Sequence, residues 1–274
     1  MKSRGATYCI RILLLSSIAT LSNATSRAAL VAHYSMENGS VADQAVDDGA
    51  QDLTLFGDAA ATTPGINGNG KLSVDGSGDY AFSASPGTNG FTSGSGVTLA
   101  TWFTTTTITS TTQQLLIQLP IAGGGLNQSG AGLDINAGKI QVGGRSLSSE
   151  GFQGTGVTAA NTLNLASNTI YFAAAVIDYA NDQVTAYLYD GITWKTDSAT
   201  VAFTNATGAG NQGLYLGRRA DNQRPFNGAI DDAMIFNTAL SEAEVKALTV
   251  PETSSAVMLA VAMGIWLANS RKRI

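Results

Sequence analysis

The chain has almost none of the two residue types that most often bind metals or act as nucleophiles and bases. Its 274 residues include one cysteine, Cys9, and one histidine, His33. Because Cys9 lies close to the N-terminus, the remaining chain has neither disulfides nor thiolate chemistry. One histidine without further cysteines excludes the usual zinc sites. A Ser-His-Asp triad would depend on His33 alone, and its place between Ala32 and Tyr34 in a predicted strand favours packing.

Charged residues are also scarce, at 13 % of the chain, whereas hydrophobic residues reach 44 %. This balance favours a packed core over disorder. Residues 30–249 contain 19 acidic and 8 basic side chains, a net charge of −11, and the other seven basic side chains lie in the two short termini. An acidic body repels phosphate backbones, so we expect no nucleic-acid partner. Divalent cations and neutral sugars stay open as ligands.

Residues 1–29 have the features of a secretory signal peptide. Lys2 and Arg4 precede an apolar run at residues 12–21, and small residues follow it. This is the order of the three regions of a signal peptide. Cleavage after Ala24 and cleavage after Ala29 both stay open. The apolar run is too short to span a bilayer without help, so we expect the segment to be removed and the body to be exported.

A second hydrophobic segment ends the chain. Pro251 and Glu252 precede an apolar run at residues 256–268, and Arg271, Lys272 and Arg273 follow it. A run of this length is marginal for a hydrocarbon core of about 30 Å. The basic residues would stay on the cytoplasmic side of a membrane, which places the body outside. A permanent anchor and a segment that is held in the membrane and then cleaved both stay open.

Polar and apolar residues alternate from residue 30 onward, which predicts an all-β body. The clearest strands and hairpins are expected at residues 97–103, 132–142, 171–178 and 183–189. Strands at this spacing with glycine-rich turns indicate a two-sheet antiparallel sandwich. One short helix is expected after Ser241, because Glu244 completes a capping box with it.

Seven blocks of this sequence resemble the LamG-like, concanavalin A-like jelly-roll family and occur in the order of that family. They are residues 30–39, 72–80, 97–103, 184–191, 214–219, 226–236 and 239–245. The resemblance covers roughly residues 30–249. It implies a two-sheet antiparallel jelly roll that recognises an extracellular polysaccharide or a surface protein.

The C-terminal segment resembles the PEP-CTERM sorting signals of Gram-negative bacteria that produce exopolysaccharide. Those signals combine Val-Pro-Glu-Pro, a short apolar helix and an arginine cluster, and an exosortase processes them. Here Val250, Pro251 and Glu252 match the motif, whereas Thr253 replaces its second proline. This resemblance implies a sorting segment at 250–274, which follows the predicted signal peptide at 1–29 and the LamG-like domain at 30–249. It also implies a place at the cell surface or in the extracellular matrix.

The same superfamily contains glycoside hydrolases, which need two carboxylates on one face. The glucanase branch carries Glu-x-Asp-x-Glu, and this chain has no such run. Asp231 and Asp232 are adjacent, so they are expected to face opposite sides of a strand. We therefore expect no catalytic residues and no enzyme activity.

Calcium is the one cofactor that the resemblance leaves open. LamG-like domains often hold Ca²⁺ at the rim of the sandwich, and carboxylate oxygens are its preferred ligands. The candidates are Asp75, Asp79, Asp231 and Asp232, although Asp75 and Asp79 also fit an ordinary turn around Gly-Ser-Gly.

Tryptophan side chains could stack on sugar rings through their flat apolar faces. We expect Trp102 in the core and regard Trp194, which follows a turn, as the better surface candidate. The leading hypothesis is an exported, non-catalytic surface or biofilm-matrix protein that binds carbohydrate or a protein partner. The alternatives are a glycan-active hydrolase of the same superfamily and a structural coat protein without a discrete ligand.

Overall fold

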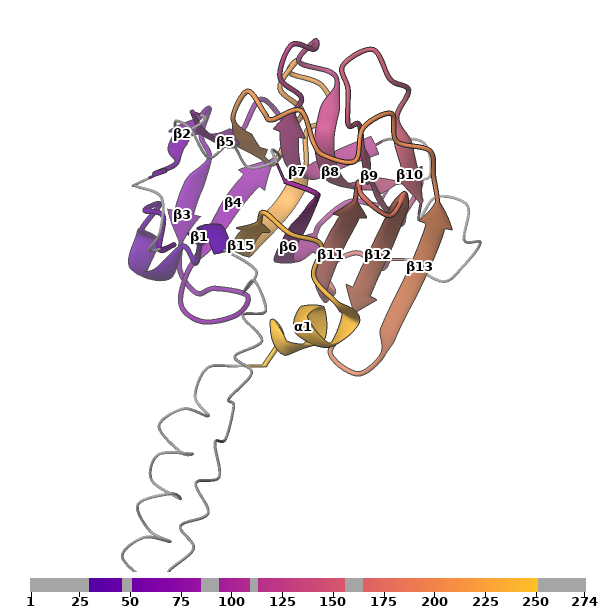
Figure 1. The fold of residues 1–274 in the computed structure, drawn as a ribbon. Helices are drawn as coiled ribbons and strands as arrows, with labels where there is room; N and C mark the ends of the chain where they lie inside the picture. The colour runs from indigo at the N-terminus through magenta and orange to yellow at the C-terminus, as the bar shows by residue number, and fades with distance from the viewer. Residues whose placement is uncertain (1–29, 46–50, 85–93, 109–112, 156–164, 251–274) are drawn as a thin grey trace, which may run out of the picture.

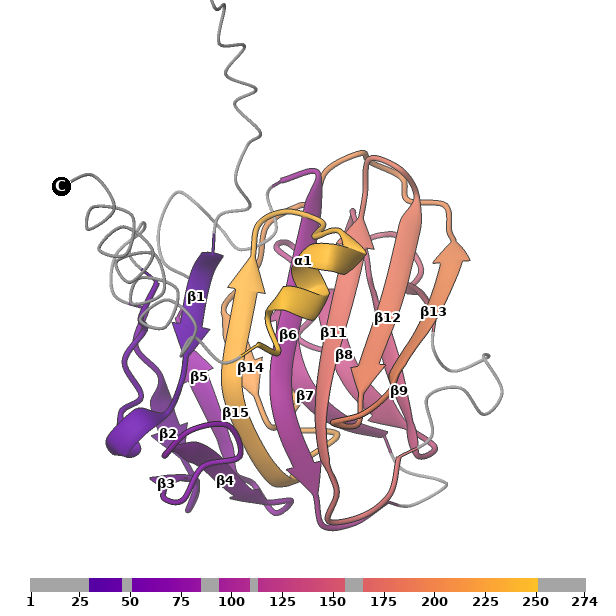
Figure 2. The same ribbon diagram turned by 90° about the horizontal axis from the view of Figure 1, so that it is seen from below.

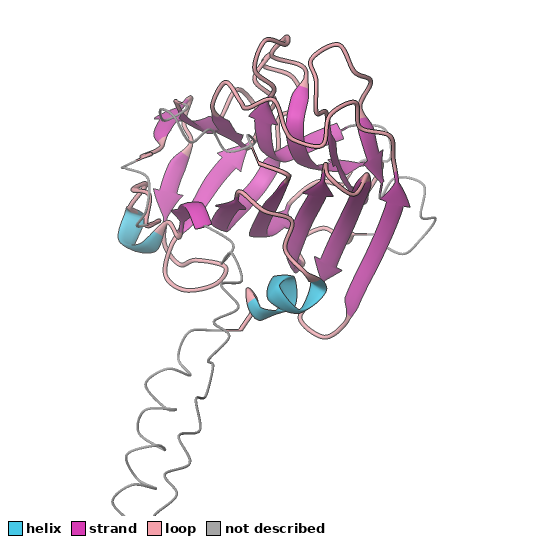
Figure 3. Cartoon of the chain, in the orientation of Figure 1, coloured by secondary structure: helices cyan, strands magenta, loops and turns pink. Residues whose placement is uncertain are grey.

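The computed structural model describes residues 30–45, 51–84, 94–108, 113–155 and 165–250. Within these ranges, two antiparallel sheets pack face to face (Figures 1 and 3). The all-β sandwich and its antiparallel sheets are therefore confirmed. The predicted signal peptide at 1–29 and the sorting residues Pro251 and Glu252 lie outside the described ranges. No helix within these ranges is long and apolar enough to cross a membrane.

The eight-stranded sheet has the order β13-β12-β11-β6-β15-β4-β3, and β1 pairs with β15. Its strands are β1 (Leu30–Tyr34), β3 (Ala60–Thr62), β4 (Lys71–Asp75), β6 (Gly96–Thr105), β11 (Ile170–Asp178), β12 (Gln183–Tyr189), β13 (Trp194–Thr200) and β15 (Asn227–Phe236). The seven-stranded sheet has the order β10-β9-β8-β7-β14-β5-β2. Its strands are β2 (Thr54–Phe56), β5 (Tyr80–Ser83), β7 (Gln113–Pro120), β8 (Ser129–Asn136), β9 (Lys139–Gly144), β10 (Gln153–Thr155) and β14 (Leu214–Leu216).

The two predicted hairpins form because their turns suit a sharp reversal. β8 and β9 pair from Ala131 to Asn136 across a turn in which Ala137 and Gly138 both have positive φ. β11 and β12 pair in the same antiparallel way, and Asp182 has a positive φ of 53° in their turn. Short turns of this kind favour left-handed residues because their twist matches that of the strands. Both hairpins confirm the sequence prediction.

The main hydrophobic core lies between the two sheets. On β6, Leu99 and Phe103 point into this core, whereas Ala100 and Trp102 belong to a second cluster on the outer face of the sheet. The alternation expected for residues 97–103 is therefore confirmed. Phe103 is fully buried, and its ring centroid lies 5.7 Å from that of Tyr171.

The helix α1 (Glu242–Ala247) covers the outer face of the eight-stranded sheet. Figure 2 shows it lying in front of β6 and β11. The Ser241 side chain accepts a hydrogen bond from the Glu244 backbone N–H, and the Glu244 carboxylate accepts one from the Ser241 N–H. The predicted capping box is thus present. Val245 is fully buried in the second cluster, so α1 closes this face with apolar side chains. A single turn of 3-10 helix, η1 (Glu37–Gly39), follows β1.

Candidate functional site

The outer face of the seven-stranded sheet carries polar side chains along β8. Leu133 and Ile135 of this strand point into the main core. Because side chains alternate along a strand, Gly132, Asp134 and Asn136 take the outer face. The sequence pattern Gly-Leu-Asp-Ile-Asn therefore divides this strand between an apolar core side and a polar outer side.

The register of the neighbouring strands adds further polar groups beside Asp134. Asp134 pairs with Leu115 on β7 and with Gln141 on β9. Gly132 pairs with Gln118 on β7 and with Gly143 on β9. Because Gly132 and Gly143 have no side chains, this part of the sheet surface forms a depression between the longer side chains around it.

A hollow of about 150 Å³, which we call the β8 hollow, opens on this face. Gly132 lines it, and its other walls include Gln113, Asp134, Gln141, Arg145, Phe152 and Arg224. A pocket with a few convergent polar groups and an aromatic wall is a typical small-molecule site. The donor and acceptor groups here come from β7, β8 and β9 and from the two loops that hold the arginines.

Asp134 is the buried acid of the β8 hollow, with an exposed fraction of 5 %. Its Oδ2 accepts a hydrogen bond from Nη1 of Arg224 at 3.2 Å. Its Oδ1 is buried and has no hydrogen-bond partner in the described part of the chain. Burial raises the pKa of Asp134 to about 7, although the charges of Arg224 and Arg219 act in the opposite direction. A buried carboxyl oxygen without a partner is costly unless a ligand or water supplies a donor.

Arg224 reaches the hollow from the loop between β14 and β15. Its carbonyl accepts a hydrogen bond from the Leu115 N–H at 3.0 Å, which fixes this loop beside β7. Gln118, fully buried on β7, accepts a second bond from the Ala220 N–H at 2.8 Å. Arg224 has a φ of 57°, a left-handed conformation that is unfavourable for a long side chain. Such strain persists where the surrounding contacts fix the residue, and it often marks a functional position.

Arg145 enters the hollow from the end of β9. Its Nε donates to the Glu150 carbonyl at 3.0 Å, and its guanidinium lies 5.5 Å from the ring centroid of Phe152. The Glu150 carboxylate accepts hydrogen bonds from Ser146 and Thr204. Glu150 makes no side-chain hydrogen bond to Arg145 among the described residues, although its charge acts on that guanidinium. The Arg145 guanidinium therefore keeps further donors at the hollow.

A row of aromatic rings occupies the other end of the same sheet face. The ring centroids of Phe56 and Tyr80 lie 4.5 Å apart, and those of Tyr80 and Tyr215 lie 6.1 Å apart. The Arg218 guanidinium lies 3.5 Å from the Tyr80 centroid. Phe56 and Arg218 thus cover the two flat faces of Tyr80. The row presents ring edges more than open faces, which makes it a poorer sugar platform than the β8 hollow.

Comparison with known proteins places this architecture in a family. The sequence profile described as the concanavalin A-like lectin/glucanases superfamily matches residues 75–246. The chain belongs to this superfamily. The resemblance of its sequence blocks to LamG-like domains is therefore confirmed. No curated protein matches the chain.

Several solved structures of other proteins share the fold. One is domain 4 of AbnA, a GH43 extracellular arabinanase from Geobacillus stearothermophilus, solved in complex with arabinotriose. It matches with a TM-score of 0.56 at 17 % identity, and the match covers 81 % of this chain and 99 % of that domain. The botulinum neurotoxin serotype D ligand-binding domain, in complex with N-acetylneuraminic acid, has a TM-score of 0.59 at 13 % identity and covers 80 % of this chain. This chain spans about half the length of that toxin domain, since the match covers 50 % of it. Identities this low show a shared fold alone.

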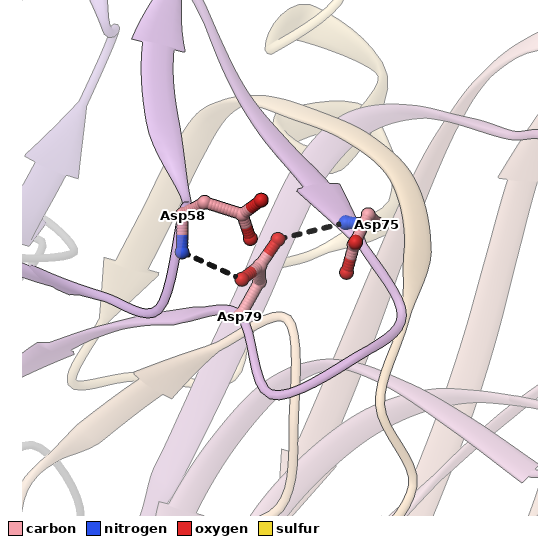
Figure 4. Close-up of side chains that lie close together, drawn as sticks. All are labelled: Asp58, Asp75 and Asp79. Carbon is pink, nitrogen blue, oxygen red and sulfur yellow. Dashed lines mark hydrogen bonds between the residues drawn. The ribbon is translucent and has the colours of Figure 1, made fainter.

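Two of the predicted calcium residues lie together in this concanavalin A-like body, and a third acid joins them. Figure 4 shows Asp58, Asp75 and Asp79, whose nearest carboxylate oxygens all lie within 4.8 Å of one another. Asp79 is 1 % exposed; its Oδ1 accepts from the Asp58 N–H at 2.9 Å and its Oδ2 from the Asp75 N–H at 3.0 Å.

The hydrogen bonds of Asp79 organise the turn between β4 and β5 without a cation. These bonds also help to lower the pKa of Asp79 against the effect of burial. The pKa of Asp58 is raised, chiefly by a hydrogen bond between its side chain and that of Asp79. The three acids could offer oxygen ligands to a cation, and the calcium hypothesis for Asp75 and Asp79 stays a prediction.

The other two calcium candidates lie elsewhere and make a different set of contacts. Asp75 pairs with Asn227, so Asp231 lies four residues further along β15, about 13 Å away for an extended strand. The four candidates therefore do not form one site.

The expectation that Asp231 and Asp232 face opposite sides is wrong. Asp231 Oδ2 accepts from the Asn67 N–H at 2.8 Å, and Asp232 Oδ2 accepts from Asn67 Nδ2 at 2.6 Å. The alternation fails because the register of β15 shifts between Asp231 and Met234, and Asp232 has a φ of 47°. Asp232 also bonds His33 Nε2 at 3.0 Å, which gives the only histidine of the chain a structural partner.

Trp102 and Trp194 lie on the outer face of the eight-stranded sheet. Trp102 is 9 % exposed, as expected for a packed residue. Trp194 is half-buried; its ring stacks on Tyr189 with centroids 4.9 Å apart, and the Lys246 amine lies 5.8 Å from its centroid. Trp194 therefore packs beside α1 and is not an open sugar platform.

Proposed function

We propose that this chain is an exported, non-catalytic glycan-binding protein that holds one sugar residue in the β8 hollow. The observation that carries the proposal is Oδ1 of Asp134, a buried acceptor without a partner among the described residues. Leaving such a group unpaired costs about 1–3 kcal/mol. A sugar hydroxyl supplies the missing donor, so binding would recover this free energy.

The other walls of the β8 hollow suit a sugar as well. Gln141 Oε1 accepts hydrogen bonds from Gln113 Nε2 and Asn136 Nδ2. This arrangement leaves Gln113 Oε1 as an acceptor and Gln141 Nε2 as a donor for sugar hydroxyl groups. Phe152 provides an apolar surface for the C–H groups of a pyranose. Related folds also carry sugar sites, since the arabinanase domain and the toxin domain were solved with arabinotriose and N-acetylneuraminic acid. These complexes support a sugar as the class of ligand. The position of the sugar on this chain is inferred from the residues that line the β8 hollow.

The absence of catalysis is part of the proposal. Glycoside hydrolases of the usual type need two carboxyl groups, about 5–5.5 Å apart in retaining enzymes and about 6.5–9.5 Å apart in inverting ones. Asp134 is the single carboxylate among the described residues that line the β8 hollow. One acid can orient a hydroxyl, but it cannot act as acid and nucleophile at once.

A panel of bacterial exopolysaccharides tests this function. We expect the wild-type chain to bind at least one polymer, and Asp134→Ala to weaken that binding by up to about tenfold, since a lost hydrogen bond is worth about 0.5–1.5 kcal/mol. Glu242→Gln, on exposed α1, is the matched control and should bind as the wild type does. Release of reducing ends from the bound polymer would instead support a hydrolase. Failure to bind any polymer would favour a structural coat protein.

The export route completes the proposal. Residues 1–29 act as a signal peptide, and residues 250–274, with Pro251 and Glu252, act as a PEP-CTERM-like sorting segment for an exosortase of a Gram-negative bacterium. The mature protein then lies at the cell surface or in the extracellular matrix. Mass spectrometry of the protein from producing cells should show a chain that begins after Ala24 or Ala29 and lacks the apolar run at 256–268. A membrane-bound chain that keeps this run would reveal a permanent anchor.

A further inference from the structure

The arginines of the body are concentrated around one sheet face. Residues 30–249 contain four arginines, Arg145, Arg218, Arg219 and Arg224, within a segment of net charge −11. Arg145 and Arg224 line the β8 hollow, and Arg218 lies over Tyr80 on the same sheet. Arg219 is in the same loop as Arg224. An acidic protein thus carries a local group of cations at its proposed sugar site.

The protein itself does not neutralise all of these cations. Arg219 is paired with Asp221 through two hydrogen bonds of 2.7 Å. Arg224 makes one side-chain hydrogen bond in the described part of the chain, to Asp134. Arg145 donates to the backbone carbonyls of Glu150 and Ser129, at 3.0 and 3.5 Å, and these carry no net charge. Two guanidinium groups and one carboxylate therefore line the hollow, and the charge of Glu150, which does not line it, acts on Arg145 from the neighbouring loop.

We infer that the sugar residue bound in the β8 hollow carries an anionic group, a carboxylate or a sulfate, which Arg224 and Arg145 bind. This inference rests on the proposed function. The guanidinium fork matches the paired oxygens of such groups, and charge-assisted hydrogen bonds are stronger than neutral ones. Partial burial strengthens the attraction because water screens it less. Among the side chains that line the hollow, a neutral sugar would leave one guanidinium without an anionic group in contact.

The titration of Asp134 gives the inference a second readout. Burial raises its pKa to about 7, and the charged groups near it are Arg224, Arg219 and Arg145, with Glu150 next to Arg145. Lowering the pH from 8 to 6 protonates Asp134 and removes its repulsion of a bound anion, while the neutral carboxyl still accepts a hydrogen bond from a sugar hydroxyl. A uronate with an ordinary pKa near 4 stays ionised in this range. Binding of an acidic glycan should therefore tighten as the pH falls, and Asp134→Asn should remove this dependence.

Matched pairs of polymers provide the test. Alginate and polygalacturonate are compared with their carboxyl-reduced forms, and a sulfated galactan with its desulfated form, by calorimetry on the full chain at constant salt. We expect at least one acidic polymer to bind about tenfold more tightly than its neutral form. Whether the uronates or the galactan bind shows which anionic group is recognised. Arg224→Gln and Arg145→Gln should each abolish the preference, whereas Lys195→Gln on β13 should keep it.

The outcomes separate the two claims. Equal or tighter binding of the neutral forms would overturn the inference and leave glycan binding in place. A preference that persists in both arginine variants would overturn it too, because the anion would then bind elsewhere. Failure of every polymer to bind, acidic or neutral, here and in the exopolysaccharide panel, would overturn the proposed function together with the inference.

Discussion

Gly132→Leu is expected to abolish glycan binding while the sandwich stays folded. Gly132 lines the β8 hollow, and a Cβ there would lie 3.4 Å from Ser129 Oγ, which is an ordinary contact. The backbone can therefore accept a side chain. The rest of the leucine would occupy much of a hollow of about 150 Å³. We expect an affinity loss of about 100-fold or more, since a filled pocket excludes the ligand sterically.

The control adds the same side chain outside the hollow. Gly151 lies in an exposed loop, and a Cβ there would meet no atom within 4 Å. Gly151→Leu should keep wild-type affinity, and both variants should melt close to the wild type in a thermal denaturation. If Gly132→Leu binds glycan normally, the sugar lies elsewhere, and the aromatic row of Phe56, Tyr80 and Tyr215 becomes the next candidate.

Of the variants proposed for this protein, Asp231→Ala is expected to lower the free energy of unfolding most. Asp231 is fully buried, and its carboxylate accepts hydrogen bonds from the N–H groups of Ile66, Asn67 and Asp232. The alanine variant leaves three part-buried backbone donors without an acceptor. Because each unsatisfied donor costs about 1–3 kcal/mol, we expect the free energy of unfolding to fall by about 3–5 kcal/mol. Thermal denaturation should show a Tm lower by about 10 °C for a body of this size.

An exposed turn provides the matched control for this loss. The Asp190 carboxylate accepts hydrogen bonds from the N–H groups of Ile192 and Thr193, but water can replace it there. Asp190→Ala should therefore cost less than about 1 kcal/mol, as for most exposed substitutions. Similar Tm shifts for the two variants would show that the Asp231 contacts contribute no more than an ordinary turn.

The local parts of this fold could be predicted because their causes lie within a few residues. The β8–β9 hairpin follows from alternation and a turn with Gly138, and α1 begins where Ser241 and Glu244 form a capping box. The same alternation puts Asp134 on the face of β8 opposite to Leu133 and Ile135, which is the outer face of the sheet. It could not show that this aspartate is buried, because the cover comes from a loop that is distant in sequence.

The β8 hollow itself could not be predicted from local pattern. Arg224 pairs with Asp134 across 90 residues, and only the register of β7 with β8 brings them together. The same limit explains why Asp58 was missed beside Asp75 and Asp79. Long-range pairing of strands decides these contacts, and hydrophobic periodicity carries no information on it.

The central claim is that glycan binds in the β8 hollow of the seven-stranded sheet. The most direct test is nuclear magnetic resonance mapping of backbone amide shifts as an oligosaccharide from a bound polymer is added. The account predicts the largest changes at Gly132, Asp134 and Gln141 on the β8–β9 hairpin and at Arg224 in the adjoining loop. Changes confined to the aromatic row, or to the outer face of the eight-stranded sheet around Trp194 and α1, would contradict it.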